Sequence, residues 1–347
     1  MSRLAVIAPY GAPSVQGNAV TVERVTRGLR ELGEEVRVWD LSAASEAAVA
    51  QAVEDYRPAV VHAFHAGRTG PLALRLARCL EVPLVVTLTG TDANHDLLDA
   101  ERAPLVRRVL EGAAAITAFH ASVVEHVAAV LPDTRPRFVV VPQAVRFFAE
   151  TPFDLASRWS LPDDRVLFLL PAGIRPVKAP RAPLAPFDRL ALNDPRVRLA
   201  YAGPVLDIEE GEALERELAR RPWARYLGVV PHAQMASLLR QADVVLNCSV
   251  SEGGMANALL EALALQRAVL ASDIPGNRAL VEDEVTGLLF GDASELGAKA
   301  ERLTHDAALR TRLGREGRRL VEREFSIERE VRGYRTVYQH LIPVASS

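Results

Sequence analysis

The stretch ADVVLNCSVSEGGMANALLEALALQRAVLAS, residues Ala242 to Ser272, reads as a strand, a loop, a helix and a second strand. Its apolar runs ADVVLNCS (242–249) and RAVLAS (267–272) lack strict alternation, which is typical of strands buried on both faces of a parallel sheet. Between them stand a glycine pair and a helix-forming run. The stretch therefore predicts a β-α-β unit, and its first loop lies at the sheet edge where such folds bind ligands.

The same alternation of apolar runs and helical segments continues through the whole chain, which indicates a doubly wound α/β architecture. Helical patterns cover about 19–32, 72–80 and 306–338. The strand candidates are 4–8, 36–41, 59–64, 83–89, 114–119 and 138–142, and then 166–172, 197–203, 224–230, 242–249 and 267–272.

Two domains are expected, because 347 residues exceed the size at which one hydrophobic core usually stops growing. The stretch FFAETPFDLASRWSLPDDR (147–165) lacks periodicity and contains two prolines, which favours a boundary there. The predicted domains are 1–148 and 149–325, and we expect a C-terminal helix, 326–347, that returns to the first domain.

The composition is that of an ordinary soluble protein, with 49% hydrophobic and 24% charged residues and a formal net charge of −3. Nothing in this balance indicates a nucleic-acid partner. The two cysteines, Cys79 and Cys248, lie in mainly apolar stretches and predict reduced, buried thiols in a cytoplasmic protein. The first apolar run is too short for a signal peptide or a membrane span.

The loop GIRPVKAP follows the strand candidate 166–172 and carries two cations, Arg175 and Lys178. Lysine occurs only at 178 and 299, and every other basic residue is arginine. Arginine can fork onto two oxygens and lysine adds a point charge, so the pair suits a polyphosphate. A solvated basic loop is the alternative.

The loop after 242–249 is suited to close backbone approach. Gly253 and Gly254 carry no Cβ, and the first turn of the next helix, about Met255 to Ala258, offers amides and a positive dipole end to an anion. Glu261, about two turns into that helix, is placed to reach a ribose diol. The same segment contains Glu252, Ala256 and Asn257.

The loop after the first strand, PYGAPSVQGNAVTVERV, lacks the G-x-G-x-x-G spacing of a dinucleotide site, which weakens a dehydrogenase interpretation. Gly17 precedes a helix that begins near Asn18. Asn18 and Thr21 either cap this helix, or its amides bind an anion or hydroxyls.

Four segments together, GIRPVKAP, YLGVVPHAQMASLLRQADVVLNCS, SEGGMANALLEALALQRAVLAS and DIPGNRALVEDEVTGLLF, resemble family 4 glycosyltransferases of the GT-B type. The resemblance implies two Rossmann-like domains facing across a cleft, with a nucleotide-sugar donor bound by the second and an acceptor by the first. It also implies retention of anomeric configuration, no metal and no other cofactor.

The resemblance further implies roles for individual residues. Arg175 and Lys178 would neutralise the departing diphosphate, and Glu261 would hold the ribose. Glu252 and the backbone from Gly253 to Ala256 would face the sugar and phosphate. The loop 227–231, with Val229, would lie against the base.

Three departures from the family pattern narrow the resemblance. Eight residues separate Glu252 from Glu261 where seven are usual, the basic pair is Arg-x2-Lys instead of Arg-x4-Lys, and Thr89 stands where many members carry histidine. The segments GNAVT, LTGTD, R-x-V-K and IPGN resemble a subgroup of glycosyltransferase 1 domain-containing proteins and selenosugar synthases. A synthase of that kind would join the sugar of a UDP-sugar to selenophosphate, so the acceptor stays open.

The first domain offers candidates for acceptor binding. His62 and His65 follow a strand and either face the cleft or have structural roles. In GTDANHD, Leu97 and Ala103 replace residues that a calcium loop requires, so we reject metal binding there. Thr91 and Asp92 are expected to contact acceptor hydroxyls.

The sequence thus predicts a metal-independent, retaining glycosyltransferase that uses a UDP-sugar or another nucleotide sugar and a small-molecule or glycan acceptor. A nucleotide-sugar 2-epimerase and a non-catalytic nucleotide-sugar-binding protein are the alternatives. No integral membrane segment is expected.

Overall fold

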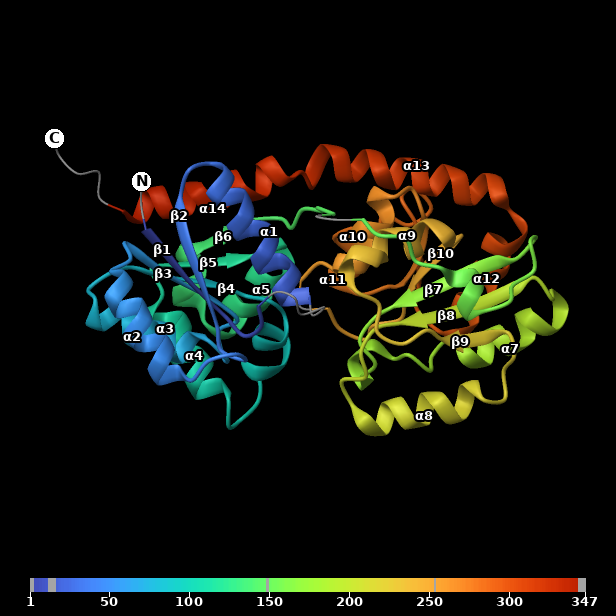
Figure 1. Cartoon of the computed structure of the whole chain (residues 1–347), viewed down its shortest axis with the longest axis horizontal. Helices are drawn as coiled ribbons and strands as arrows, with labels where there is room; N and C mark the ends of the chain where they lie inside the picture. The colour runs from blue at the N-terminus through green and yellow to red at the C-terminus, as the bar shows by residue number, and fades with distance from the viewer. Residues whose placement is uncertain (1–2, 12–16, 148–149, 253, 343–347) are drawn as a thin grey trace. The chain divides into compact units, whose positions relative to one another are not determined.

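The computed structural model describes residues 3–11, 17–147, 150–252 and 254–342 (Figure 1). The chain divides into two compact units. Unit 1 comprises Met1–Ala144 and Phe325–Ser347, and unit 2 comprises Val145–Glu324. The first division falls between Ala144 and Val145, whereas the sequence predicts the boundary after residue 148.

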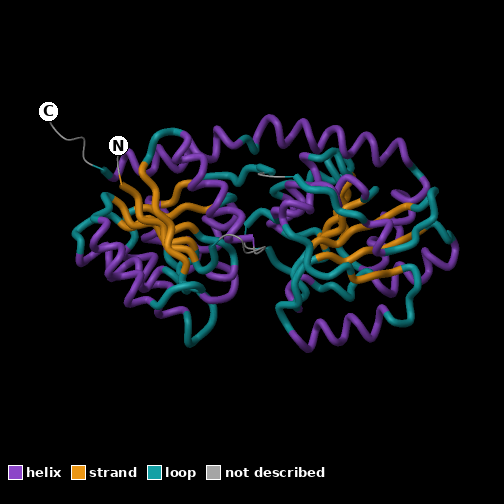
Figure 2. The backbone as a smooth tube through the Cα atoms, in the orientation of Figure 1, coloured by secondary structure: helices purple, strands orange, loops and turns teal. Residues whose placement is uncertain are grey.

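Unit 1 is built on a six-stranded parallel sheet with the order β2-β1-β3-β4-β5-β6 (Figure 2). Its strands are β1 (Arg3–Ala8), β2 (Glu35–Asp40), β3 (Val60–Phe64), β4 (Leu84–Thr87), β5 (Ala115–Ala118) and β6 (Phe138–Val140). Its helices are α1 (Gly17–Glu31), α2 (Glu46–Tyr56), α3 (Gly70–Cys79), η1 (Asp92–Asp96), α4 (Ala103–Gly112), α5 (Ala121–Val130), η2 (Pro132–Arg137) and α14 (Ile327–Leu341).

Both faces of this sheet are covered, which explains the uninterrupted apolar runs of its strands. Ala5 and Ile7 belong to a core with α2, α3 and α4, whereas Leu4 and Val6 belong to a core with α1 and α14. Because alternate strand residues point to opposite faces, every position of β1 after its first is buried. The C-terminal helix α14 thus completes the core of unit 1.

Unit 2 has a second six-stranded parallel sheet with the order β12-β11-β10-β7-β8-β9. Its strands are β7 (Val166–Pro171), β8 (Val197–Ala202), β9 (Ala224–Tyr226), β10 (Val244–Asn247), β11 (Ala268–Ser272) and β12 (Leu288–Phe290). Its helices are α6 (Leu155–Arg158), η3 (Pro176–Lys178), α7 (Leu184–Asn193), α8 (Ile208–Leu218), α9 (His232–Gln241), α10 (Asn257–Ala264), α11 (Pro275–Arg278), α12 (Ala293–His305) and α13 (Ala307–Glu324).

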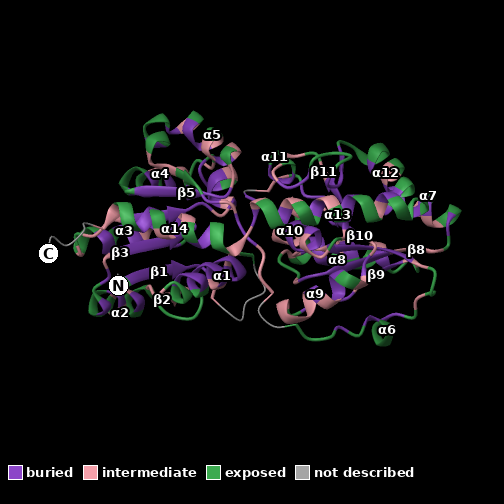
Figure 3. Cartoon of the chain, turned by 90° about the horizontal axis from the view of Figure 1, so that it is seen from above, coloured by how far each residue is buried: buried purple, intermediate pink, exposed green. Residues whose placement is uncertain are grey.

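The strand candidates all correspond to observed strands, and one further strand, β12, was not predicted. Its three residues are too short a run to stand out beside the turn residues that precede them. Figure 3 shows that the central strands of both sheets are mostly buried, whereas the edge strands β2, β6 and β9 and the outer faces of the helices have exposed positions.

One expectation about an individual residue, that Cys79 is buried, is wrong. Cys248 is buried, but Cys79 is exposed because it lies on the outer side of the last turn of α3. Among the described residues, no helix combines the length and apolar character needed to cross a bilayer.

Candidate functional site

Lys178 and Glu252 form an ion pair at the carboxyl edge of the unit 2 sheet. Lys178 ends η3 after β7, and Glu252 lies in the loop after β10, the strand that pairs with β7. The same carboxylate oxygen accepts hydrogen bonds from Ser249 Oγ at 2.7 Å and Asn247 Nδ2 at 3.2 Å. Three donors from two neighbouring loops therefore meet on one oxygen.

Glu252 stays ionised at this position although it is largely buried. Burial acts to raise its pKa, but the charge of Lys178 and the hydrogen bonds from Lys178, Ser249 and Asn247 act against it, and the net result is a pKa below the ordinary value. The carboxylate is therefore a fixed negative charge that orients the ammonium group. The side chain of Lys178 is 17% exposed, so it still reaches the surface of the loop edge.

Arg175 lies at the start of the same loop, in extended backbone before η3. Its Nε atom is buried and has no hydrogen-bond partner among the described residues. A buried donor without a partner is costly, and an oxyanion beside it would relieve that cost. Arg175 and Lys178 thus both lie at the carboxyl edge that the sequence predicted for a polyphosphate.

Glu261 lies on α10, and its Oε1 is hydrogen-bonded to His232 Nε2 at 2.9 Å. The helix begins at Asn257, so Glu261 is about one turn from its start, and the expected two turns were wrong. Met255 and Ala256 are buried, and both precede the helix because Ala256 has an extended conformation. His232 was missed, since nothing near it in the sequence points to α10.

The remaining predicted residues of unit 2 lie in the loop after β9 and around the start of α10. Val229 is 54% exposed and lies in the loop after β9. Gly254 is buried beside the loop after β11, and Asn257 is the first residue of α10. Gly253 lies outside the described residues.

Gly276 and Asn277 lie in the segment after β11 and support the loop that holds Glu252. A Cβ on Gly276 would lie 2.6 Å from Glu252 Cβ and 2.7 Å from the Gly254 carbonyl oxygen. Asn277 is fully buried, and its Nδ2 donates to the carbonyl oxygen of Ser272 at 2.9 Å. The loop after β11 therefore packs directly under the Glu252 segment.

In unit 1, the predicted residues of α1 do not cap that helix. The helix begins at Gly17, which is exposed, so Asn18 and Thr21 lie within it. Asn18 Nδ2 donates to Thr89 Oγ1 at 3.3 Å, and Thr21 Oγ1 accepts from Gln143 Nε2 at 2.9 Å. Thr89, the residue at the family histidine position, is thus tied to the start of α1.

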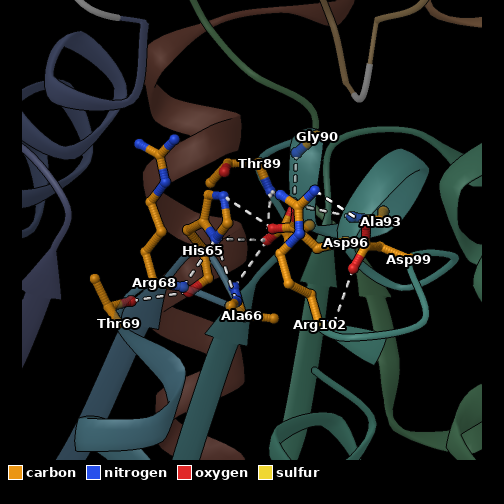
Figure 4. Close-up of polar contacts among 12 residues, drawn as sticks. His65, Ala66, Arg68, Thr69, Thr89, Gly90, Ala93, Asp96, Asp99 and Arg102 are labelled. Carbon is orange, nitrogen blue, oxygen red and sulfur yellow. Dashed lines mark hydrogen bonds and ion pairs between the residues drawn. The ribbon is translucent and has the colours of Figure 1, made fainter. Parts of the chain in front are cut away.

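Asp92 is completely buried after β4 and organises the loop around it. Its carboxylate accepts backbone N–H groups from Thr89, Gly90, Ala93 and Ala66 at 2.8 to 3.1 Å (Figure 4). Thr91, half-buried, precedes η1, a π-helical turn of five residues. π-helical turns are rare in proteins, and those that occur are often at functional sites.

The two histidines after β3 have different surroundings. His62 lies inside the unit, where its ring nitrogens lie 2.7 Å from the hydroxyls of Tyr338 and Thr87, and burial lowers its pKa to about 3. His65 lies at the carboxyl end of β3, near Asp92 and Asp96 (Figure 4). Only His65 is at the edge where a ligand of unit 1 would bind.

Within the described ranges, no group of three or more His, Cys, Asp or Glu side chains is arranged to hold a metal ion. The polar groups at the edge of unit 2 are two basic side chains, a largely buried carboxylate that is paired with one of them, and a second carboxylate on α10.

Two doubly wound parallel units with polar loops at their carboxyl edges define the GT-B architecture, and known structures agree. Sucrose-phosphate synthase from Thermosynechococcus elongatus superposes with a TM-score of 0.81 and 19% identity, covering 98% of this chain and 99% of that one. The Anabaena protein Alr3699/HepE in complex with UDP and glucose gives a TM-score of 0.78 and 16% identity, covering 98% and 100%.

Sequence comparison gives the family. Residues 3–144 match the family described as Glycosyl transferase 4-like domain, and residues 165–306 match Glycosyl transferases group 1. Together these matches cover well over half of the chain, and the protein belongs to the group 1 glycosyltransferases, as the sequence motifs predicted.

Two relatives illustrate the range of this family. Glycosyltransferase 1 domain-containing protein 1 of Xenopus tropicalis is 29% identical over 266 residues, which are 75% of this chain and 77% of that protein. A D-inositol 3-phosphate glycosyltransferase of Streptomyces bingchenggensis is 28% identical over 169 residues, which are 46% of this chain and 37% of that protein. The first relative has the name of the subgroup that the sequence resembled.

Proposed function

We propose that this glycosyltransferase transfers a sugar from a UDP-sugar to an acceptor held by unit 1, with retention of configuration and without a metal ion. The observation that carries the proposal is the Lys178–Glu252 pair beside Arg175 at the carboxyl edge of unit 2. The Anabaena neighbour of the same fold was solved with UDP and glucose, which supports a UDP-sugar as donor.

The leaving group of the transfer is a nucleoside diphosphate, on which negative charge grows as the sugar departs. Lys178, oriented by Glu252, and Arg175, with its unpartnered Nε, supply positive charge and N–H donors for that group. Fixed donors of this kind stabilise a transition state because they need no reorganisation. This arrangement would take the place of a divalent cation, which is why we propose metal independence.

Glu261 is the proposed ligand of the ribose hydroxyls. Its Oε1 lies 2.9 Å from His232 Nε2, so the imidazole holds the carboxylate in one orientation on α10. The first turn of α10 provides amides for phosphate, as helix N-termini commonly do. Glu252, engaged by Lys178, Ser249 and Asn247, acts in this proposal by positioning Lys178.

The test compares the only two lysines of the chain. Lys178→Ala should lower the turnover of UDP-glucose by about 10² to 10³, the usual effect of removing one such donor. Lys299→Ala is the matched control, because Lys299 binds Asp283 and the Leu289 carbonyl instead. UDP release would be measured with EDTA present, and the product anomer would be determined by NMR.

Each outcome has a meaning for the proposal. Equal turnover of a folded Lys178→Ala protein and wild type would refute the role of Lys178. Loss of turnover in EDTA that added Mg²⁺ restores would refute metal independence, and an inverted anomer would refute retention. Conversion of UDP-GlcNAc to its 2-epimer without acceptor would favour the epimerase, and tight UDP binding with neither hydrolysis nor transfer would favour a binding protein.

The proposal includes a cytoplasmic location. Among the described residues, Cys79 and Cys248 are both free thiols, and Cys79 is exposed. Exposed thiols persist in reducing compartments, which supports this location. Labelling of Cys79 in intact cells by a membrane-impermeant maleimide would contradict it.

A further inference from the structure

His65 has a backbone conformation that few side chains adopt. Its φ is 86°, in the left-handed region, at the point where β3 passes into the loop before α3. Such conformations cost of order 1–3 kcal/mol and persist where the surrounding structure enforces them. The side chain is only 2% exposed, so this conformation directs the imidazole into the unit.

The hydrogen bonds of His65 fix the position of its proton. Nδ1 accepts the backbone N–H groups of Gly67 and Arg68, each at 3.2 Å. A nitrogen that accepts two N–H groups carries no proton, so the neutral ring is protonated on Nε2. His65 therefore presents an N–H donor on the side away from its own loop.

This donor has no hydrogen-bond partner among the described residues. The nearest acidic group is Asp96, whose Oδ2 lies 3.9 Å from Nε2, which is too far for a hydrogen bond. A buried donor left unpaired costs about 1–3 kcal/mol. One oxygen atom that accepts from Nε2 and donates to Asp96 would satisfy both groups, and a hydroxyl does both.

The charges around this pair favour a neutral hydroxyl over an anion. The Asp96 carboxylate also accepts from Arg102 Nη1 at 2.8 Å, and Arg102 Nη2 lies 3.2 Å from Asp99 (Figure 4). Arg102 is thus already shared between two carboxylates. The Asp96 carboxylate would repel an anion that lies between His65 and Asp96, because the two negative charges would be close together. It would not repel a neutral hydroxyl group.

We propose that His65 and Asp96 form the subsite that receives a hydroxyl of the acceptor, so that the acceptor is a neutral alcohol such as a sugar or polyol and not selenophosphate or another phosphate-like anion. The inference rests on the proposed function, since it assigns the acceptor of that reaction. His65 Nε2 donates a hydrogen bond to the hydroxyl oxygen, and the hydroxyl group donates a hydrogen bond to the Asp96 carboxylate.

The key variant is His65→Asn. Asparagine tolerates the left-handed conformation, and its Oδ1 can accept the N–H groups of Gly67 and Arg68, so the loop should keep its shape. Only the Nε2 donor is lost. With myo-inositol or glucose as acceptor, KM for the acceptor should rise about tenfold or more while KM for UDP-glucose stays unchanged. Asp96→Asn should have the same effect on the acceptor side.

A direct readout uses the histidine ring nitrogens in a long-range ¹H–¹⁵N spectrum of the UDP-bound protein, with His65 assigned by its loss in His65→Asn. Added myo-inositol or glucose should shift the His65 Nε2 signal, and thiophosphate should not. A shift with thiophosphate alone, or with none of these probes, would overturn the inference. Calorimetric binding of UDP separates the two proposals, because absent UDP binding would refute the donor assignment instead.

Discussion

Arg24 on α1 and Glu330 on α14 form an ion pair whose side chains are 2% and 0% exposed. Arg24 Nε lies 2.7 Å from Oε2 and Nη2 lies 2.8 Å from Oε1, so the guanidinium binds the carboxylate through two parallel hydrogen bonds. The pair joins residues that are 306 positions apart. It ties the C-terminal helix to the first helix of unit 1.

Removal of Glu330 should destabilise unit 1 strongly. Glu330→Ala leaves the Arg24 charge buried with less compensation, which typically costs about 3–5 kcal/mol. Glu125→Ala, which breaks the exposed pair with Arg135, is the control and should cost less than about 1 kcal/mol. Urea unfolding followed by Trp39 fluorescence, with Trp159 and Trp223 replaced by phenylalanine, would measure both; equal costs would refute the prediction.

Protonation of Glu252 should abolish the orientation of Lys178 only in acid. Because the pKa of Glu252 is below its ordinary value of 4.5, the stabilisation from the pair is present above that value and is lost as the pH falls through the lower folded pKa. Glu252→Gln should therefore reduce kcat at neutral pH by about tenfold. A variant as active as wild type from pH 6 to 8 would show that Lys178 needs no carboxylate.

A side chain at position 276 should disturb the donor site. In Gly276→Ala the new Cβ meets the Gly254 carbonyl oxygen and Glu252 Cβ, both well inside normal contact, so the Glu252 segment must move. We expect a weaker affinity for UDP, by about tenfold, measured by calorimetry. Gly291→Ala is the matched control, since its Cβ would meet only Glu295 Oε2 at 3.7 Å; an equal loss there would argue against a local effect.

His62 should make unit 1 sensitive to acid. Burial lowers the folded pKa of His62 to about 3, whereas the unfolded chain titrates near 6.5. Between these values the unfolded state binds the extra proton, so the free energy of unfolding should fall by up to about 1.4 kcal/mol per pH unit below pH 6. His62→Gln should remove this slope. Unfolding curves from pH 4 to 7 that are parallel for both proteins would contradict the assignment.

Much of the fold was predictable because strand and helix patterns are local. The apolar run LAVIA identifies β1 without knowledge of its neighbours, and the same holds for VLFLLPA and β7. The three-residue strand β12 escaped prediction because so short a run shows no period. The start of α10 was placed early because the extended conformation of Ala256 is set by its packing.

The candidate site was predictable only in part. The cations Arg175 and Lys178 were visible as a pair in a loop after a strand. Glu261 was visible as a carboxylate on the helix that follows the Glu252 loop. His232 and Gly276 were not, because each acts on a residue that is distant in the sequence. His65 was seen as a residue after a strand, but its left-handed backbone and unpartnered Nε2 have no sequence signal.

The sequence by itself determined which segments become buried strands and which loops carry charge, because periodicity and composition belong to each segment alone. The tertiary structure decided the partners. Lys178 meets Glu252, 74 residues away, only because the sheet order places β7 beside β10 and brings their loops to one edge. Such neighbours depend on how whole strands pair, and that pairing is decided by the joint packing of the core.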